Sequence, residues 1–115
     1  MPPKKGGKPF LVLGSPGGPT IINTVFQVIL NVIDHQLDIQ EAVDAPRVHH
    51  QWIPDELVVE RNALAADVLS RLEEMGHRIR IRREIGDAHS ILVDSPNGVL
   101  LGAPDPRSDS KASGF

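Results

Sequence analysis

Cysteine is absent from this chain of 115 residues. Disulfide bridges, thiolate metal sites and cysteine nucleophiles are therefore excluded, while the redox compartment is left open. An excess of positive charge is also missing, because the formal net charge is −3 at pH 7. The charge balance gives no general attraction to nucleic acid or to an anionic membrane surface, so we expect neither as a partner.

Long apolar runs are missing as well. No segment approaches the roughly 20 apolar residues that a transmembrane helix needs. The basic N-terminus at residues 1–8 is followed by only a short apolar run and does not match a signal peptide. We find no internal repeat, and the hydrophobic content is 40%. These features predict a single ordered domain over residues 1–115 with a modest core.

The first half of the chain predicts a strand, a glycine-rich loop and two helices. A short apolar run that stops at residues 14–18 predicts a buried strand over residues 9–14 and a tight loop after it. Pro19 suits the first position of a helix, and the apolar residues beyond it recur at helical spacing. Because these residues cover most of the helix circumference, we expect this helix to be the most buried element. Asp38 is predicted to cap a short helix over residues 39–45.

The second half of the chain alternates strand and helix signals. Residues 57–59 predict a strand. Asn62 is a suitable cap for a leucine-rich amphipathic helix, which Gly76 would end in a left-handed conformation. Alternating Ile and Arg over residues 78–85 predicts a strand with one buried and one solvated face.

A hairpin and an extended tail complete the expected fold. Apolar residues at 91–93 and 99–101 flank a turn sequence at residues 95–98, which has Pro at its second position and Gly at its fourth. Beyond the hairpin, Pro, Asp, Ser and Gly dominate. We therefore expect residues 104–115 to form an extended tail unless another segment docks it.

The glycine-rich loop is the strongest candidate for a functional site. Exposed backbone N–H groups beside a helix N-terminus can hold a negatively charged oxygen. Pro19 removes one N–H group, which leaves Gly17, Gly18 and Thr20 as possible donors. Two adjacent donors are what an oxyanion hole requires. An ordinary tight turn between a strand and a helix is the alternative, and this feature alone leaves it open.

Sharper motifs are missing from this loop and from the rest of the chain. Neither the P-loop nor the dinucleotide-binding glycine pattern is present, and Leu13 stands where a hydrolase elbow around Ser15 requires glycine. The basic run at residues 77–83 alternates with Ile and lacks stacking aromatics, so it indicates a solvated strand face rather than a nucleic-acid site.

Histidine and aspartate provide two weaker candidates. His49 and His50 are neighbours in an extended segment and would point to opposite faces, so we predict no metal site and no cofactor. Asp87 and His89 precede Ser90, but proximity in sequence does not assemble a catalytic triad. We interpret them as polar residues at the entry to the hairpin.

Five segments, taken in order, resemble the γ-glutamyltranspeptidases. They are LGSPGG at residues 13–18, EAVDAPR at 41–47, HHQW at 49–52, HSI at 89–91 and DPR at 105–107. The agreement covers nearly the whole chain, which resembles the C-terminal part of the small subunit in that family. The resemblance implies the α/β class and part of an N-terminal nucleophile hydrolase αββα sandwich, with helices packed on a mixed or antiparallel sheet.

The resemblance also implies a chemistry. In the family, an N-terminal threonine attacks a γ-glutamyl amide such as glutathione, and the acyl-enzyme passes its acyl group to water or an amino acid. The glycine pair that matches Gly17 and Gly18 donates N–H groups to the oxyanion. The catalytic threonine and the substrate anchors have no counterpart in this chain. We therefore expect the chain alone to be inactive and its partner to be the missing N-terminal part or large subunit.

Two alternative functions without catalysis also fit the sequence. The chain is either a stand-alone scaffold that self-associates to cover exposed strand edges, or an anion-binding domain that uses the loop at residues 14–20. The localisation is implied only by the family, whose bacterial members are typically exported. It would be periplasmic or secreted for the full-length protein.

Overall fold

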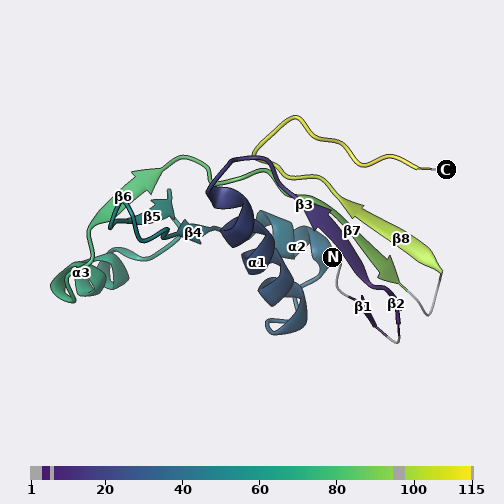
Figure 1. The fold of residues 1–115 in the computed structure, drawn as a ribbon, viewed down its shortest axis with the longest axis horizontal. Coiled ribbons are helices and arrows are strands. Elements are labelled where there is room, and N and C mark those ends of the chain that lie inside the picture. Colours follow the sequence, from purple (N-terminus) through teal and green to yellow (C-terminus); the bar gives the residue numbers. More distant parts are fainter. Residues whose placement is uncertain (1–3, 6, 95–97, 115) are drawn as a thin grey trace.

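The fold was analysed in a computed structural model that describes residues 4–5, 7–94 and 98–114 (Figure 1). Its elements, in chain order, are β1 (Lys4–Lys5), β2 (Lys8–Pro9), β3 (Leu11–Gly14), α1 (Thr20–Ile33), α2 (Ile39–Asp44), β4 (Val48–His49), β5 (Leu57–Glu60), α3 (Ala66–Glu74), β6 (Ile79–Arg82), β7 (His89–Asp94) and β8 (Val99–Ala103).

Strands β3 to β8 form two separate three-stranded sheets (Figure 1). One is antiparallel with the order β3-β7-β8, and the other has the order β4-β5-β6, with β5 and β6 parallel. The short strands β1 and β2 pair with each other. Among the described residues, no helix is long and apolar enough to cross a membrane.

The core lies between one face of the β3-β7-β8 sheet and the helices α1 and α2. Leu11, Val28 and Val43 are fully buried there, together with Ala88. The other face of the sheet is open: Val12 and its register partner Ile91 are 46% and 42% exposed. Side chains on a strand alternate between the two faces of a sheet, so this sheet has one face covered by helices and one uncovered face.

Helix α1 is less buried than predicted. Ile22 and Phe26 are 77% and 55% exposed, whereas Thr24 is fully buried. The polar side chains of Gln27 and Asn31 turn inward and donate to backbone carbonyls of β4 and α2. The prediction was wrong because the hydrophobicity of a helix does not reveal which of its sides meets a neighbour.

The predicted signals at helix ends had different outcomes. The Asp38 cap is confirmed, since its carboxylate accepts a 2.8 Å hydrogen bond from the N–H of Glu41. Gly76 follows α3 with φ of +98°, as predicted. The Asn62 cap is wrong: Asn62 has φ of +64° in a turn after β5, and α3 begins only after Ala65. Asn62 instead takes the left-handed conformation of a turn in which the N–H of Ala63 donates to the carbonyl of Glu60 at 3.0 Å.

The predicted alternating strand is shorter and more exposed than expected. β6 ends at Arg82, and Ile81 is 52% exposed, so the strand lacks the buried face that the pattern predicted. It lies at the edge of its sheet, where fewer neighbours can cover it. Ile85, outside the strand, is fully buried.

The hairpin of β7 and β8 is confirmed, although the predicted turn at residues 95–97 lies outside the described residues. The segment after β8 first docks against the core and then runs without regular structure through residue 114. Asp105 is the clearest contact of this segment with the rest of the fold, since it is only 1% exposed. The C-terminal segment is therefore attached to the fold before it becomes extended (Figure 1).

Candidate functional site

The glycine-rich loop connects the end of β3 to the start of α1. Gly17 and Gly18 both have positive φ, at +126° and +59°. Both residues are exposed, and neither N–H group donates a hydrogen bond to any residue that the structure describes. Two adjacent backbone donors are thus available to a ligand at a helix N-terminus.

Contacts within the loop define its shape. The Oγ1 of Thr20 donates to the carbonyl of Gly17 at 2.9 Å, and the N–H of Thr20 points to the same oxygen at 3.3 Å. Thr20 is therefore not the third free donor that the sequence suggested, because its N–H group is used within the turn. A Cβ atom on Gly17 would lie 2.5 Å from Thr20 Oγ1, so only glycine fits at this position.

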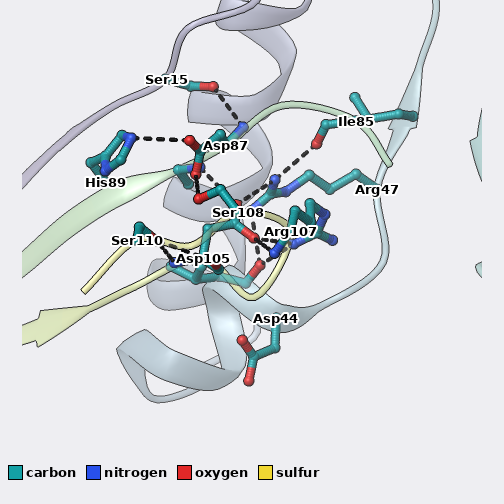
Figure 2. Close-up of polar contacts among 12 residues, drawn as sticks. Ser15, Asp44, Arg47, Ile85, Asp87, His89, Asp105, Arg107, Ser108 and Ser110 are labelled. Atoms are coloured by element: carbon teal, nitrogen blue, oxygen red, sulfur yellow. Dashed lines mark hydrogen bonds and ion pairs between the residues drawn. The ribbon is translucent and has the colours of Figure 1, made fainter. Parts of the chain in front are cut away.

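A polar cluster around Asp87 lies next to Ser15 of the loop (Figure 2). The N–H of Asp87 donates to Ser15 Oγ at 3.1 Å, and Ser108 Oγ donates to Asp87 Oδ1 at 2.8 Å. The Nε2 atom of His89 lies 3.2 Å from Asp87 Oδ2. The interpretation of Asp87 and His89 as isolated hairpin-entry residues was incomplete, because the fold adds serines from two remote segments that no local pattern connects to them.

Four buried charges lie next to this cluster. Positive and negative side chains alternate in this charge cluster, and each side chain is at most 8% exposed. The four residues are Arg47, Asp105, Arg107 and Glu60. Arg107 holds Glu60 with two hydrogen bonds of 2.6 Å and Asp105 with one of 3.0 Å. Arg47 completes the set with a 2.9 Å contact to Asp105. Because the charges balance, each buried ion has a partner of opposite sign.

The carboxylates of this charge cluster are stabilised in their ionised form. Burial alone raises the pKa of Glu60, but hydrogen bonds from Arg107 and from the N–H groups of Ile85 and Arg47 outweigh it and hold the pKa below its usual value. Asp105 behaves in the same way. Burial raises its pKa, but hydrogen bonds from the N–H groups of Ala88 and Arg107 and from the Arg107 side chain outweigh burial and hold the pKa below its usual value. Both groups therefore remain charged when buried.

The charge cluster fixes the segment that carries Asp87. The N–H of Ile85 donates to Glu60 Oε2 at 2.8 Å, and the N–H of Ala88 donates to Asp105 Oδ2 at 2.7 Å. On either side of Asp87 the backbone is thus bound to a buried carboxylate. In the sequence, Arg47 and Arg107 stood out only as parts of the segments that carry the family resemblance. Their burial could not be predicted, because it depends on contacts between distant segments.

The two neighbouring histidines contact polar side chains of helix α1 and of the segment after β4. His49 is buried, and its ring contacts Asn23 at 2.7 Å and Gln51 at 2.8 Å. The ring of His50 lies 3.2 Å from Asp55. Within the described part of the chain, no group of three or more His, Cys, Asp or Glu side chains is placed to hold a metal ion.

Solved structures with the same arrangement define the class of fold. An acivicin-inhibited γ-glutamyltranspeptidase matches with a TM-score of 0.88 and 47% identity, over 96% of this chain and 60% of that chain. A γ-glutamyltranspeptidase from Pseudomonas nitroreducens complexed with L-DON matches with a TM-score of 0.90 and 35% identity, over 100% of this chain and 60% of that chain. The fold is thus α/β, part of an N-terminal nucleophile hydrolase sandwich.

Sequence comparison defines the family within that class. The family model for γ-glutamyltranspeptidase matches residues 4–115. The glutathione hydrolase proenzyme of Escherichia coli K12 is 48% identical over 96% of this chain, and that of Bacillus subtilis 168 is 36% identical over the same share. This chain belongs to the γ-glutamyltranspeptidase family. It spans only 19% of the length of each of these two relatives.

Proposed function

We propose that this chain supplies the oxyanion hole of a γ-glutamyltransferase or glutathione hydrolase. The observation that carries the proposal is the pair of unengaged N–H groups on Gly17 and Gly18, in an exposed loop that opens a helix. Donors held at such a point stabilise the negative oxygen that develops during acyl transfer. The family membership supports a γ-glutamyl amide as the acyl donor.

The nucleophile in this proposal comes from outside the chain. An N-terminal threonine attacks the γ-glutamyl carbonyl carbon, and the carbonyl oxygen becomes an oxyanion bound by Gly17 and Gly18. Collapse of the tetrahedral intermediate breaks the C–N bond, the leaving nitrogen takes up the proton that the threonine hydroxyl lost, and an acyl-enzyme ester remains. Water or an amino acid then attacks the acyl-enzyme through a second oxyanion at the same donors.

The partner is the remaining part of a longer γ-glutamyl enzyme, as the short share of the relatives' length supports. Without the threonine and the substrate anchors, the chain alone performs no turnover. Its uncovered sheet face and helix flank lead to self-association when the partner is missing. Export to the periplasm or medium belongs to the same proposal and rests on the family alone.

The test compares the chain alone with the chain joined behind the upstream part of the 48% identical E. coli relative. We call the second protein the joined enzyme. We expect release of aniline from a γ-glutamyl anilide only by the joined enzyme, in a host strain without its own γ-glutamyl activity. Turnover by the chain alone, or a folded joined enzyme without turnover, would contradict the proposal.

A further inference from the structure

Asp87 joins two segments that are far apart in the sequence. Its backbone N–H donates to the hydroxyl of Ser15 at 3.1 Å, and its carboxylate accepts from the hydroxyl of Ser108 at 2.8 Å (Figure 2). Ser15 belongs to the glycine-rich loop, whereas Ser108 belongs to the docked C-terminal segment. Asp87 therefore connects these segments directly.

The hydroxyl of Ser15 carries this contact into the oxyanion loop. It donates to the carbonyl oxygen of Pro16 at 2.8 Å. That carbonyl and the N–H of Gly17 belong to one planar peptide group, so fixing the direction of the carbonyl also fixes the direction of the N–H. The orientation of the Gly17 donor thus depends on where Ser15 is held.

Asp87 is itself held firmly. The residues on either side of its dipeptide, Ile85 and Ala88, donate to the buried carboxylates of Glu60 and Asp105. Gly86 has φ of +73° and lies so close to Thr24 that no side chain fits between them. A group positioned by a rigid segment can transmit a constraint without relaxing.

We propose that Asp87 is a positioning residue that couples docking of the C-terminal segment, residues 105–110, to the orientation of the Gly17 N–H group. The route runs from Ser108 through Asp87 and Ser15 to the peptide group between Pro16 and Gly17. Without the Ser108 contact, the ring of His89 is the remaining described partner of the Asp87 carboxylate. The carboxylate then turns toward His89 and tilts the Asp87 N–H between its fixed neighbours, which moves Ser15 and the peptide group between Pro16 and Gly17. The inference rests on the proposed role of Gly17 as an oxyanion donor.

The experiment is NMR of the joined enzyme, which carries all 115 residues of this chain, with glycine amides labelled to observe Gly17. We expect Ser108→Ala to shift this resonance and to lower its order parameter from about 0.85 toward about 0.6, the range of flexible backbone. Ser108→Thr keeps the hydroxyl and should restore the wild-type resonance. Ser113→Ala, an exposed position three residues beyond that segment, is the matched control and should change neither quantity.

A double-mutant cycle separates coupling from general loosening. Ser15→Ala and Ser108→Ala should act on the Gly17 amide non-additively, with the double variant close to Ser15→Ala alone. Asp87→Asn, which keeps the shape of the side chain, provides a second route to the same readout. A wild-type Gly17 resonance in Ser108→Ala, or independent addition of the two changes, would overturn the inference. No turnover is measured, so the coupling can fail while the oxyanion role survives.

Discussion

At the scale of single residues, Gly17 and Gly18 have different reasons to be glycine. Gly17 has φ of +126° and faces Thr20, while Gly18 has φ of +59° and open space where a Cβ atom would lie. Alanine tolerates the conformation of Gly18 at a cost of roughly 1–2 kcal/mol, but not that of Gly17. The two positions therefore form a matched pair for mutagenesis.

We expect Gly17→Ala to lower the free energy of unfolding by about 1 kcal/mol or more beyond the loss caused by Gly18→Ala. An added methyl group at Gly17 is opposed both by the positive φ and by the contact with Thr20. At Gly18 only the positive φ opposes it. Urea unfolding of the two variants measures the difference. Equal losses would show that the loop relaxes around the added methyl group.

The buried carboxylates of Glu60 and Asp105 predict a pH dependence of stability. Their pKa values are lower in the folded chain than in the unfolded chain, where they are about 4. Their contribution is therefore fully present above the unfolded pKa and is lost as the pH falls toward the folded pKa. We expect the free energy of unfolding to fall steeply below about pH 4.5.

Glu60→Gln isolates one of these carboxylates. This variant should be less stable at pH 7 and should lose less stability than the wild type between about pH 5 and pH 3, because it has one fewer proton to take up. Urea unfolding across this range measures the slope. A slope equal to that of the wild type would show that Glu60 does not contribute to the acid sensitivity.

At the scale of secondary-structure elements, one side chain of helix α1 pairs with the backbone of β4 as a neighbouring strand would. The amide of Gln27 donates to the carbonyl of Val48 at 2.7 Å and accepts from its N–H at 3.0 Å. Both backbone groups of Val48 are thus satisfied by one side chain. Removing it leaves two partly buried polar groups without a partner.

We expect Gln27→Leu to destabilise the chain by about 2 kcal/mol. Gln40→Leu is the control, since Gln40 is exposed and its bonds to Asp44 and Pro104 are open to water. It should cost less than about 1 kcal/mol. Thermal or urea unfolding compares the two, and a Gln27 variant as stable as its control would contradict the role of this contact.

Elements specified by neighbouring residues were predictable from the sequence. The Asp38 cap, the left-handed Gly76 and the β7–β8 hairpin each depend on chemistry within a few residues, and the structure contains all three. The inward side of α1 and the exposed face of β6 depend on distant neighbours, so periodicity alone misplaced them. The positive φ of Gly17 and Gly18 is a local demand that their residue type indicates. The Asp87 cluster depends on serines from remote segments, which no local pattern indicates.

At the scale of the whole molecule, two of the uncovered apolar surfaces in the described chain lie on regular elements. One is the flank of α1 that carries Ile22 and Phe26, and the other is the outer face of the β3-β7-β8 sheet with Val12 and Ile91. Large exposed apolar surfaces on one molecule favour association. In the proposed enzyme, these surfaces are available to the rest of the protein.

We expect the isolated chain to self-associate, because no partner covers these surfaces. Sedimentation velocity over a range of concentrations should show species larger than a monomer. Phe26→Lys, which places a charge on the exposed flank of α1, should shift the distribution toward the monomer, whereas Val68→Lys on the partly exposed face of α3 serves as the control. A monomer at all concentrations would contradict association through these surfaces.

The central claim is that the N–H groups of Gly17 and Gly18 stabilise an oxyanion. Proline is unsuitable as a probe because both residues have positive φ, which its ring forbids. Replacing Gly18 by glycolic acid in the joined enzyme removes one N–H and keeps the backbone shape. We predict a fall in kcat for the γ-glutamyl anilide of about 100- to 1,000-fold. An unchanged kcat in the folded ester-containing enzyme would contradict the claim.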